Sequence, residues 1–318
     1  MKLVFGFFCV AVQLFAAYSD DELEGLWASI KDIHSPTLEE YRLIDQYLAK
    51  GKRPYFRHLY EATRFDPSRM ERILSFRLIG DSDVVPVCET YDFNVNEKTD
   101  KRCIVLYGSA NGAYRKKALR LLGEIENSGY SGHVLLRIGG FPNTQFGGLK
   151  ICHVPYACKV AFLEEARLLG YQEILWLDLA IHPLDGFEEV FLRIKENGHF
   201  FTNVGSLQDN YPTHLLKAAE ALQITENLYP QIPHLSSSMI GINVENRQAV
   251  QLLKIWYAET ANVYPSMTWW PEELSLSVAA WRMGCKPFTW FGNMVCSQSE
   301  MYQLENRPSV QFYLDSSR

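Results

Sequence analysis

A single carboxylate follows the most apolar run of the chain, and it is the first residue whose position suggests chemistry. Residues 173–178 read EILWLD, so that a predicted buried strand ends on Asp178. A charge at the end of such a strand needs a partner or water, because burying it alone is costly. A Mg²⁺ or Mn²⁺ ion is one natural partner, with water, His182 or Asp185 completing the ligand set. The alternative is that Asp178 caps the following turn or pairs with an arginine.

A second candidate is the small-residue loop at 108–114, which reads GSANGAY. It joins a predicted strand to a predicted helix, and small residues there let backbone N–H groups approach a nucleotide or phosphate. The loop has neither the G-x-G-x-x-G spacing of dinucleotide sites nor the glycine-lysine of a P-loop. An ordinary tight turn explains it at least as well.

The elements that must position these residues alternate from residue 102 onward. Strands are predicted at 103–108, 133–138, 149–154, 173–178, 199–203 and 239–244, and helices at 114–125, 155–169, 187–196, 247–260 and 272–283. This alternation is typical of an α/β fold with a mostly parallel central sheet and helices on both faces, related to Rossmann folds. Ligands of such folds bind where strands end, which is where the loop at 108–114 and Asp178 are expected.

Composition describes a globular protein with an ordinary core. The chain has 318 residues, 47% of them hydrophobic, and a net charge of −6 from 31 basic and 37 acidic side chains. A nucleic-acid partner would need clustered Lys and Arg on one face, which the sequence does not show. We therefore expect no nucleic-acid binding.

The N-terminus has the three parts of a signal peptide. Lys2 precedes an apolar run over 3–17, and Ala17 and Ser19 fit cleavage after Ser19. We expect residues 1–19 to be removed and the protein to enter a secretory pathway, for the lumen of the endoplasmic reticulum or Golgi or for secretion. The alternatives are a bacterial periplasm and an uncleaved anchor, the only form that would place it on a membrane. Residues 20–100 are predicted as a helical flank and 101–318 as the α/β domain.

Six cysteines remain after residue 19, and they fall into three pairs of sequence neighbours. The pairs are Cys88 with Cys103, Cys152 with Cys158, and Cys285 with Cys296. An oxidising compartment would favour disulfides, but the pairing is a hypothesis from proximity. Buried free thiols are the alternative.

The segment around Asp178 resembles the GT-A glycosyltransferases, a superfamily of nucleotide-diphospho-sugar transferases. The likeness consists of Lys159 on a helix, Gly170 before a strand, and Trp176-Leu177-Asp178 at the end of that strand. Two later segments also resemble family segments, SMIGIN at 238–243 and WWPEELS at 269–275. The resemblance runs from about residue 102 to about 290.

Two departures from the family pattern concern the metal. Ala180 stands where the D-x-D motif would have its second aspartate, and no histidine follows Trp290 to act as a late metal ligand. A metal-independent enzyme, or a noncatalytic glycan-binding or interaction protein on the same scaffold, therefore remains an alternative.

The resemblance implies a hexosyl- or pentosyltransferase. It would move a sugar from a UDP- or GDP-linked donor to a glycan, protein or lipid acceptor, with Mn²⁺ or Mg²⁺ at the diphosphate. The donor-binding residues would be Ser109, Asn111, Arg115, Asn143 and Lys159, and the metal ligands Asp178 and His182. Arg115 also fits a solvated helix face, and His182 also fits an ordinary hydrogen-bonded histidine.

By the same resemblance, the segment at 269–275 would serve the acceptor. Glu272 or Glu273 would be the general base that removes the acceptor hydroxyl proton in an inverting transfer. Both also fit stabilisation of a helix dipole, since they follow a proline at a helix start. Trp269 and Trp270 would stack on the acceptor sugar, although paired tryptophans are as often part of a core.

Overall fold

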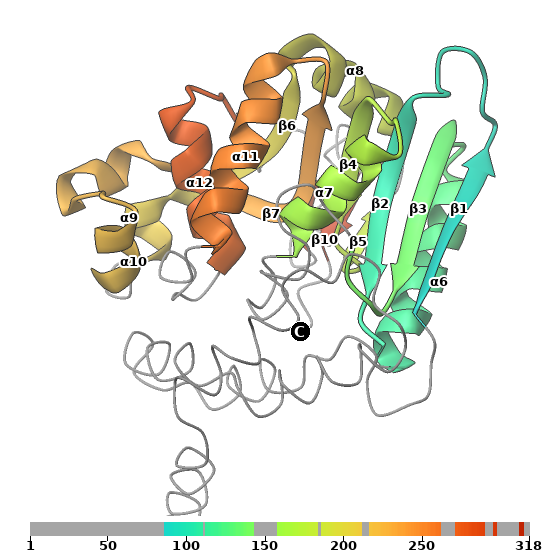
Figure 1. Ribbon diagram of the computed structural model, residues 1–318, viewed down its shortest axis with the longest axis horizontal. Coiled ribbons are helices and arrows are strands. Elements are labelled where there is room, and N and C mark those ends of the chain that lie inside the picture. Colours follow the sequence, from blue (N-terminus) through green and yellow to red (C-terminus); the bar gives the residue numbers. More distant parts are fainter. Residues whose placement is uncertain are drawn as a thin grey trace, which may run out of the picture.

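A seven-stranded sheet forms the centre of the protein (Figure 1). The computed structural model describes residues 86–110, 112–142, 158–183, 186–211, 216–261, 271–289, 295–297 and 312–314. The strands of this sheet are β1 (Val87–Phe93), β2 (Arg102–Gly108), β3 (Gly132–Ile138), β4 (Glu173–Leu177), β6 (His199–Ser206), β7 (Pro233–Asn243) and β8 (Phe288–Thr289). Their order is β1-β3-β2-β4-β7-β6-β8.

Most of these strands run in the same direction. β2 is parallel to β3 and to β4, and β6 is parallel to β8. β7 is antiparallel to both β4 and β6, and β1 is antiparallel to β3. Five strands therefore share one direction, and the predicted mostly parallel α/β sheet is confirmed.

Helices cover both faces of the sheet. They are α6 (Gly112–Asn127), α7 (Lys159–Leu168), α8 (Phe187–Asn197), α9 (Leu207–Asn210), α10 (Leu216–Ala221), α11 (Arg247–Ala261) and α12 (Pro271–Arg282), with a 3₁₀ helix η2 (Glu226–Gln231). One core contains α7, α11 and part of α12, and the core on the opposite face contains α6 and α8 (Figure 1). Successive residues of β2 alternate between the two cores, because side chains of a strand point to opposite faces in turn. A third core joins α9, α10 and η2 to α12.

A small second sheet lies beside the main one. It contains β5 (Ile181–Pro183), β10 (Phe312–Leu314) and β9 (Val295–Ser297), in the order β5-β10-β9. Phe312 is fully buried in the core of α6 and α8, so this late segment of the chain is anchored to the domain. Within the ranges given above, the structure contains no helix with the length and apolar character needed to cross a membrane.

The predicted helical flank is wrong at its C-terminal end. Val87–Phe93 forms the edge strand β1, which pairs with β3 along its whole length, so this part of 20–100 belongs to the sheet. The predicted signal peptide at 1–19, the rest of the flank up to residue 85, and the strand predicted at 149–154 lie outside the described residues.

The predicted pairing of neighbouring cysteines is also wrong where the structure describes it. Cys88, Cys103, Cys158 and Cys285 all carry free thiols. Cys88 lies on β1 and Cys103 on β2, with β3 between them. Two strand spacings separate them by about 10 Å, which is beyond the reach of a disulfide.

Candidate functional site

The backbone at the end of β4 presents Asp178 at the edge of the sheet. The Asp178 N–H donates to the carbonyl of Ser238 on the neighbouring strand β7 (2.8 Å), and the Asp178 carbonyl accepts from the N–H of Ile181 (2.9 Å) in a turn. The carboxylate accepts a hydrogen bond from the indole Nε1 of Trp176 (3.1 Å). These three hydrogen bonds hold the Asp178 carboxylate in place at the end of β4.

Lys159 is the cation that faces Asp178. It is the first residue of α7, and its Nζ lies 3.1 Å from Oδ1 of Asp178 and 3.3 Å from Oε1 of Glu272. The same ammonium donates to the carbonyl (2.9 Å) and to Oγ (2.7 Å) of Ser237. Burial alone would lower the pKa of Lys159, but the charges of Asp178 and Glu272 outweigh burial and raise it. Lys159 therefore remains a buried ammonium.

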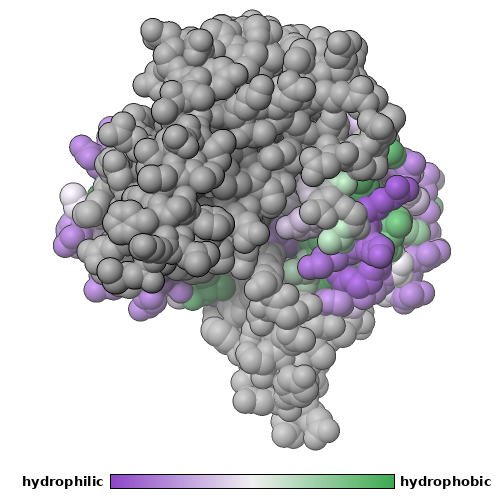
Figure 2. Space-filling view, turned by 90° about the horizontal axis from the view of Figure 1, so that it is seen from below, coloured by the Kyte–Doolittle hydropathy of each residue, from purple (hydrophilic) through white to green (hydrophobic). Residues whose placement is uncertain are grey.

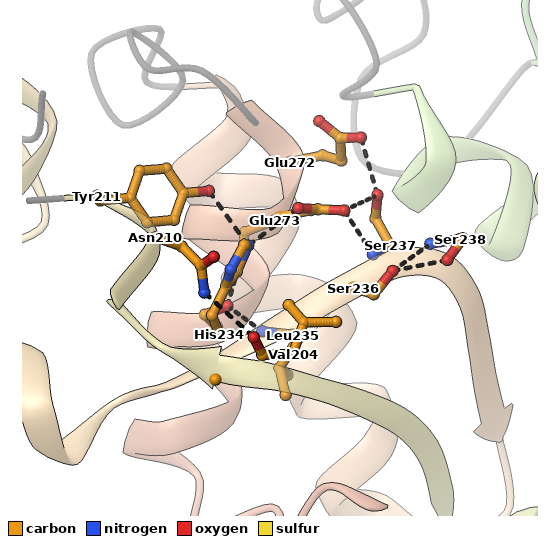
Figure 3. Close-up of polar contacts among 12 residues, drawn as sticks. Val204, Asn210, Tyr211, His234, Leu235, Ser236, Ser237, Ser238, Glu272 and Glu273 are labelled. Carbon is orange, nitrogen blue, oxygen red and sulfur yellow. Dashed lines mark hydrogen bonds and ion pairs between the residues drawn. The ribbon is translucent and has the colours of Figure 1, made fainter. Parts of the chain in front are cut away.

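Two adjacent glutamates open α12 (Figure 3), and the first of them lies beside the ammonium of Lys159. Oε1 of Glu273 accepts from the N–H of Ser237 (3.0 Å) and lies 3.1 Å from Ser237 Oγ, and Oε2 of Glu273 lies 2.9 Å from Nε2 of His234. Oε1 of Glu272 lies 2.9 Å from Ser237 Oγ. The hydroxyl of Ser237 has a single proton, so it can donate to only one of the two carboxylates at a time.

The surroundings shift the pKa values of Glu272 and Glu273 in opposite directions. Burial raises the pKa of Glu272, and the charge of Lys159 offsets this rise only in part. Burial would also raise the pKa of Glu273, but the hydrogen bond and charge of His234 and the N–H of Ser237 lower it below its usual value. Neighbouring titratable groups whose pKa values are pushed apart are typical of acid–base sites.

One oxygen of this cluster has no hydrogen-bond partner within the described structure. It is Oε2 of Glu272, and it is buried. A buried polar atom without a partner is rare, because it forfeits its hydrogen bonds to water. The atom is therefore ready to exchange a hydrogen bond or a proton with a ligand.

Three members of the cluster were not predicted from the sequence. Ser237 and His234 come from β7, and the hydroxyl of Tyr211 lies 3.5 Å from Nε2 of His234. The signal that could have found them is the run of three serines at 236–238 in a buried strand, since buried hydroxyls need polar partners. Nothing in the sequence indicated which carboxylates those partners were.

Other predicted site residues lie apart from the cluster. His182 on β5 contacts α6, with Nδ1 2.6 Å from Nη1 of Arg120 and 3.1 Å from Oε1 of Glu124. Ser109 is buried just after β2. The predicted residues Asn111, Asn143, Trp269 and Trp270 lie outside the described residues.

Arg115 has the surroundings of a solvated helix face. It is exposed on α6, among the exposed residues 113–117, and α6 packs on the sheet face opposite to α7. Seen from below, the described surface on the side of α6 and β1 is largely hydrophilic with scattered hydrophobic residues (Figure 2). The structure thus does not bring Arg115 together with Lys159.

The described residues do not fit a divalent metal site at Asp178. No group of three His, Cys, Asp or Glu side chains among them could hold a metal ion. The Asp178 carboxylate already faces the ammonium of Lys159 and the indole of Trp176, and His182 contacts α6 instead. A metal ion would have to displace Lys159 from Asp178. Asp185, the other predicted helper, lies outside the described residues.

Comparison with known proteins gives matches in structure only. No protein-family model matches the sequence, and no curated protein matches it. One similar solved structure is the galactosyltransferase LgtC in complex with donor and acceptor sugar analogues, with 9% identity over 68% of this chain and 87% of that chain and a TM-score of 0.40. Another is a glycosyltransferase involved in the glycosylation of the major capsid of PBCV-1, with 12% identity over 68% of this chain and 94% of that chain and a TM-score of 0.39. At such identities and TM-scores, these likenesses carry no argument about what this chain does.

Proposed function

We propose that the protein is a glycosyltransferase that moves a sugar from a UDP- or GDP-linked donor to a glycan, protein or lipid acceptor. The observation that supports this proposal is the meeting of Lys159, Asp178 and Glu272 in one buried cluster at the end of β4. The sequence resemblance selected these three residues from separate segments of the chain. An α/β sheet binds its ligands at this edge.

The cluster offers the groups that a sugar transfer requires. In an inverting transfer, Glu272 or Glu273 takes the proton of the acceptor hydroxyl. The acceptor oxygen then bonds to the anomeric carbon, while the bond from that carbon to the diphosphate oxygen breaks and its electron pair leaves with the nucleoside diphosphate. The fixed positive charge of Lys159 stabilises the negative charge that develops on the leaving group.

The Mn²⁺ or Mg²⁺ ion expected from the sequence stays a prediction. The described residues favour Lys159 as the counter-charge at Asp178, and we assign no step to a metal ion. The donor experiment below includes Mn²⁺ to decide between the two cations.

A noncatalytic glycan-binding protein on the same scaffold is the second candidate. It is favoured by Ala180 at the second position of the D-x-D motif and by the ion pair that already satisfies Asp178. Such a protein would bind a sugar or nucleotide without breaking the sugar–diphosphate bond.

The proposal is tested by calorimetric titration of the full chain with UDP and GDP, with and without Mn²⁺. The variants are Asp178→Asn and Lys159→Met, each confirmed as folded by circular dichroism. The control is Lys195→Met, because Lys195 is an exposed residue of α8. We expect wild type and control to bind a nucleotide, and Lys159→Met to bind it at least about tenfold more weakly, since it loses the positive charge at the site. Asp178→Asn should weaken binding only if a metal ion links Asp178 to the diphosphate.

The outcomes separate the candidates. Binding that requires Mn²⁺ and is lost in Asp178→Asn would assign the counter-charge to a metal ion. Binding that is indifferent to Mn²⁺ and lost in Lys159→Met would assign it to the ammonium. If a bound UDP- or GDP-sugar is neither hydrolysed nor transferred, the noncatalytic candidate is favoured. If neither nucleotide binds under any condition, the glycosyltransferase proposal is wrong.

A further inference from the structure

A continuous line of polar side chains leads from Tyr211 to Glu272 (Figure 3). The hydroxyl of Tyr211 contacts Nε2 of His234 (3.5 Å), and the same nitrogen lies 2.9 Å from Oε2 of Glu273. Ser237 then links Glu273 to Glu272 through its hydroxyl. Tyr211 follows α9, His234 and Ser237 lie on β7, and the glutamates open α12, so the line exists only in the folded protein.

His234 is held firmly within this line. It is 3% exposed on β7, and the ring of Tyr211 meets the imidazole edge-on, with 5.0 Å between the ring centroids. A side chain packed in this way has little freedom to leave its hydrogen bond. The imidazole of His234 can therefore determine the protonation state of the Glu273 carboxylate.

We propose that His234 is a positioning residue that gives the two glutamates different tasks. Its hydrogen bond fixes Glu273 as a carboxylate and leaves Glu272 as the group that exchanges a proton with the acceptor. This inference rests on the proposed glycosyl transfer and assigns which of the two glutamates is the base.

The hydrogen bonds of the two carboxylates differ in the way that this division requires. Glu273 is surrounded by three donors, namely the N–H and the hydroxyl of Ser237 and Nε2 of His234. A carboxylate that accepts several such hydrogen bonds keeps its charge. Glu272 uses only Oε1, toward Ser237 and Lys159, and its Oε2 has no partner in the described structure. Full charges on both carboxylates repel each other, so a proton that the pair takes up goes to Glu272 and not to Glu273.

The remaining charged groups around the pair are few. They are the ammonium of Lys159 on α7 and the carboxylate of Asp178 at the end of β4, and the titratable thiol of Cys158 lies just before α7. α11 contributes the indole of Trp256, which donates to Ser275 of α12. Its acidic residue Glu259 pairs with Arg282, the last residue of α12, and so lies at the opposite end of that helix.

The inference is tested by NMR titration of isotope-labelled glutamate carboxyl carbons in the full chain. The signals are assigned by their loss in Glu272→Gln and Glu273→Gln. In the wild type, we expect Glu273 to titrate at a lower pH than Glu272. His234→Leu has no donor at this position, so we expect the midpoint of the Glu273 titration to rise by roughly one pH unit or more. We expect the midpoint of the Glu272 titration to fall, because a neutral Glu273 no longer repels a charge on its neighbour.

Two further variants keep the test decisive. His234→Gln retains an N–H donor and should preserve the wild-type order. His133→Gln is the control, because His133 pairs with Asp92 (2.7 Å) between β3 and β1 and should leave both titrations unchanged. Equal or reversed titrations of the two glutamates in the wild type would overturn the inference, and this test does not need the His234→Leu variant. Unchanged titrations of both glutamates in a folded His234→Leu variant would overturn it as well.

The titration is separable from the proposed function. It is recorded without a donor, so a protein that binds no nucleotide can still show the predicted order. A protein that transfers sugar but shows no effect of His234 on the glutamates would retain the proposed function and lose this inference. In an active enzyme, the acidic limb of the pH profile of kcat reports the pKa of the base in the enzyme–substrate complex. We expect His234→Leu to shift this limb along the pH axis and His234→Gln to leave it in place.

Discussion

The ammonium of Lys159 lies 3.1 Å from Oδ1 of Asp178, and both side chains are largely shielded from water. Only 4% of the Lys159 side chain and 15% of the Asp178 side chain are exposed. Such a pair is costly to bury but still costlier to break, because the remaining partner becomes an uncompensated charge. The pair is therefore a structural requirement of the site as well as a candidate for its chemistry.

Replacing Lys159 should destabilise the protein strongly. Lys159→Met keeps the length of the side chain but leaves Asp178 and Glu272 without their cation, which should cost about 3–5 kcal/mol of unfolding free energy. Urea unfolding followed by circular dichroism measures it. Lys195→Met, an exposed lysine of α8, should change the unfolding free energy by less than about 0.5 kcal/mol. Equal effects of the two substitutions would contradict the ion-pair interpretation.

The two glutamates should differ in their effect on sugar transfer. Glu272→Gln preserves the shape of the side chain but removes the base, so kcat should fall about 100- to 10,000-fold. Glu273→Gln should cost less, since Glu273 acts through its hydrogen bonds to Ser237 and His234. The measurement is the initial rate of nucleotide release with a saturating donor, and exposed Glu196→Gln on α8 should retain the wild-type rate. A larger loss in Glu273→Gln would reverse the assignment.

Glu259 should make stability depend on pH far from the candidate site. Burial raises the pKa of Glu259 from 4.5 to about 7, although its Oε1 lies 2.8 Å from Nη1 of Arg282. Its folded-state pKa is above the unfolded value, so its stabilising contribution is complete below pH 4.5 and is lost as the pH rises through about 7. The difference in unfolding free energy between wild type and Glu259→Gln should change by roughly 3 kcal/mol over this range.

Urea unfolding of both proteins between these pH values measures that difference. Glu196→Gln serves as the control, because Glu196 is an exposed glutamate of α8. A flat difference for Glu259→Gln would show that Glu259 titrates normally in the folded protein.

Replacement by alanine should change the stability of the protein in opposite directions at two glycines. A Cβ at Gly241 on β7 would meet Cγ1 of Ile194 at 2.5 Å and Cβ of Phe200 at 2.7 Å, so Gly241→Ala should destabilise by about 1–3 kcal/mol. A Cβ at Gly123 within α6 would meet nothing within 4 Å, so Gly123→Ala should stabilise by about 0.4–1 kcal/mol. Thermal unfolding of the two variants beside the wild type measures both. Tolerance of alanine at Gly241 would mean that α8 packs less closely on β7 than the structure shows.

The α/β architecture could be predicted from the sequence, because each core strand and helix has a local pattern of apolar residues. The alternation of apolar runs with helical segments placed β2, β3, β4, β6 and the main helices, but it found only the second half of β7, which begins at Pro233 and not at residue 239. It also placed Asp178 at a strand end, since a charge after an apolar strand can lie only where the strand leaves the core. What it misjudged was Val87–Phe93, a short edge strand with a partly polar sequence, which is a strand because β3 offers it a partner.

The positions of the site residues relative to one another depend on the tertiary structure and could not be predicted from the sequence. Lys159 begins a helix, Asp178 ends a strand, and Glu272 and Glu273 open another helix, and no local pattern relates them. The antiparallel strand β7 lies against β4, which places Ser237 and His234 between these elements. The same topology turns His182 toward α6, where it contacts Arg120 and Glu124. Hydrogen bonds and ion pairs between distant segments depend on strand order and helix packing, and these are properties of the whole fold.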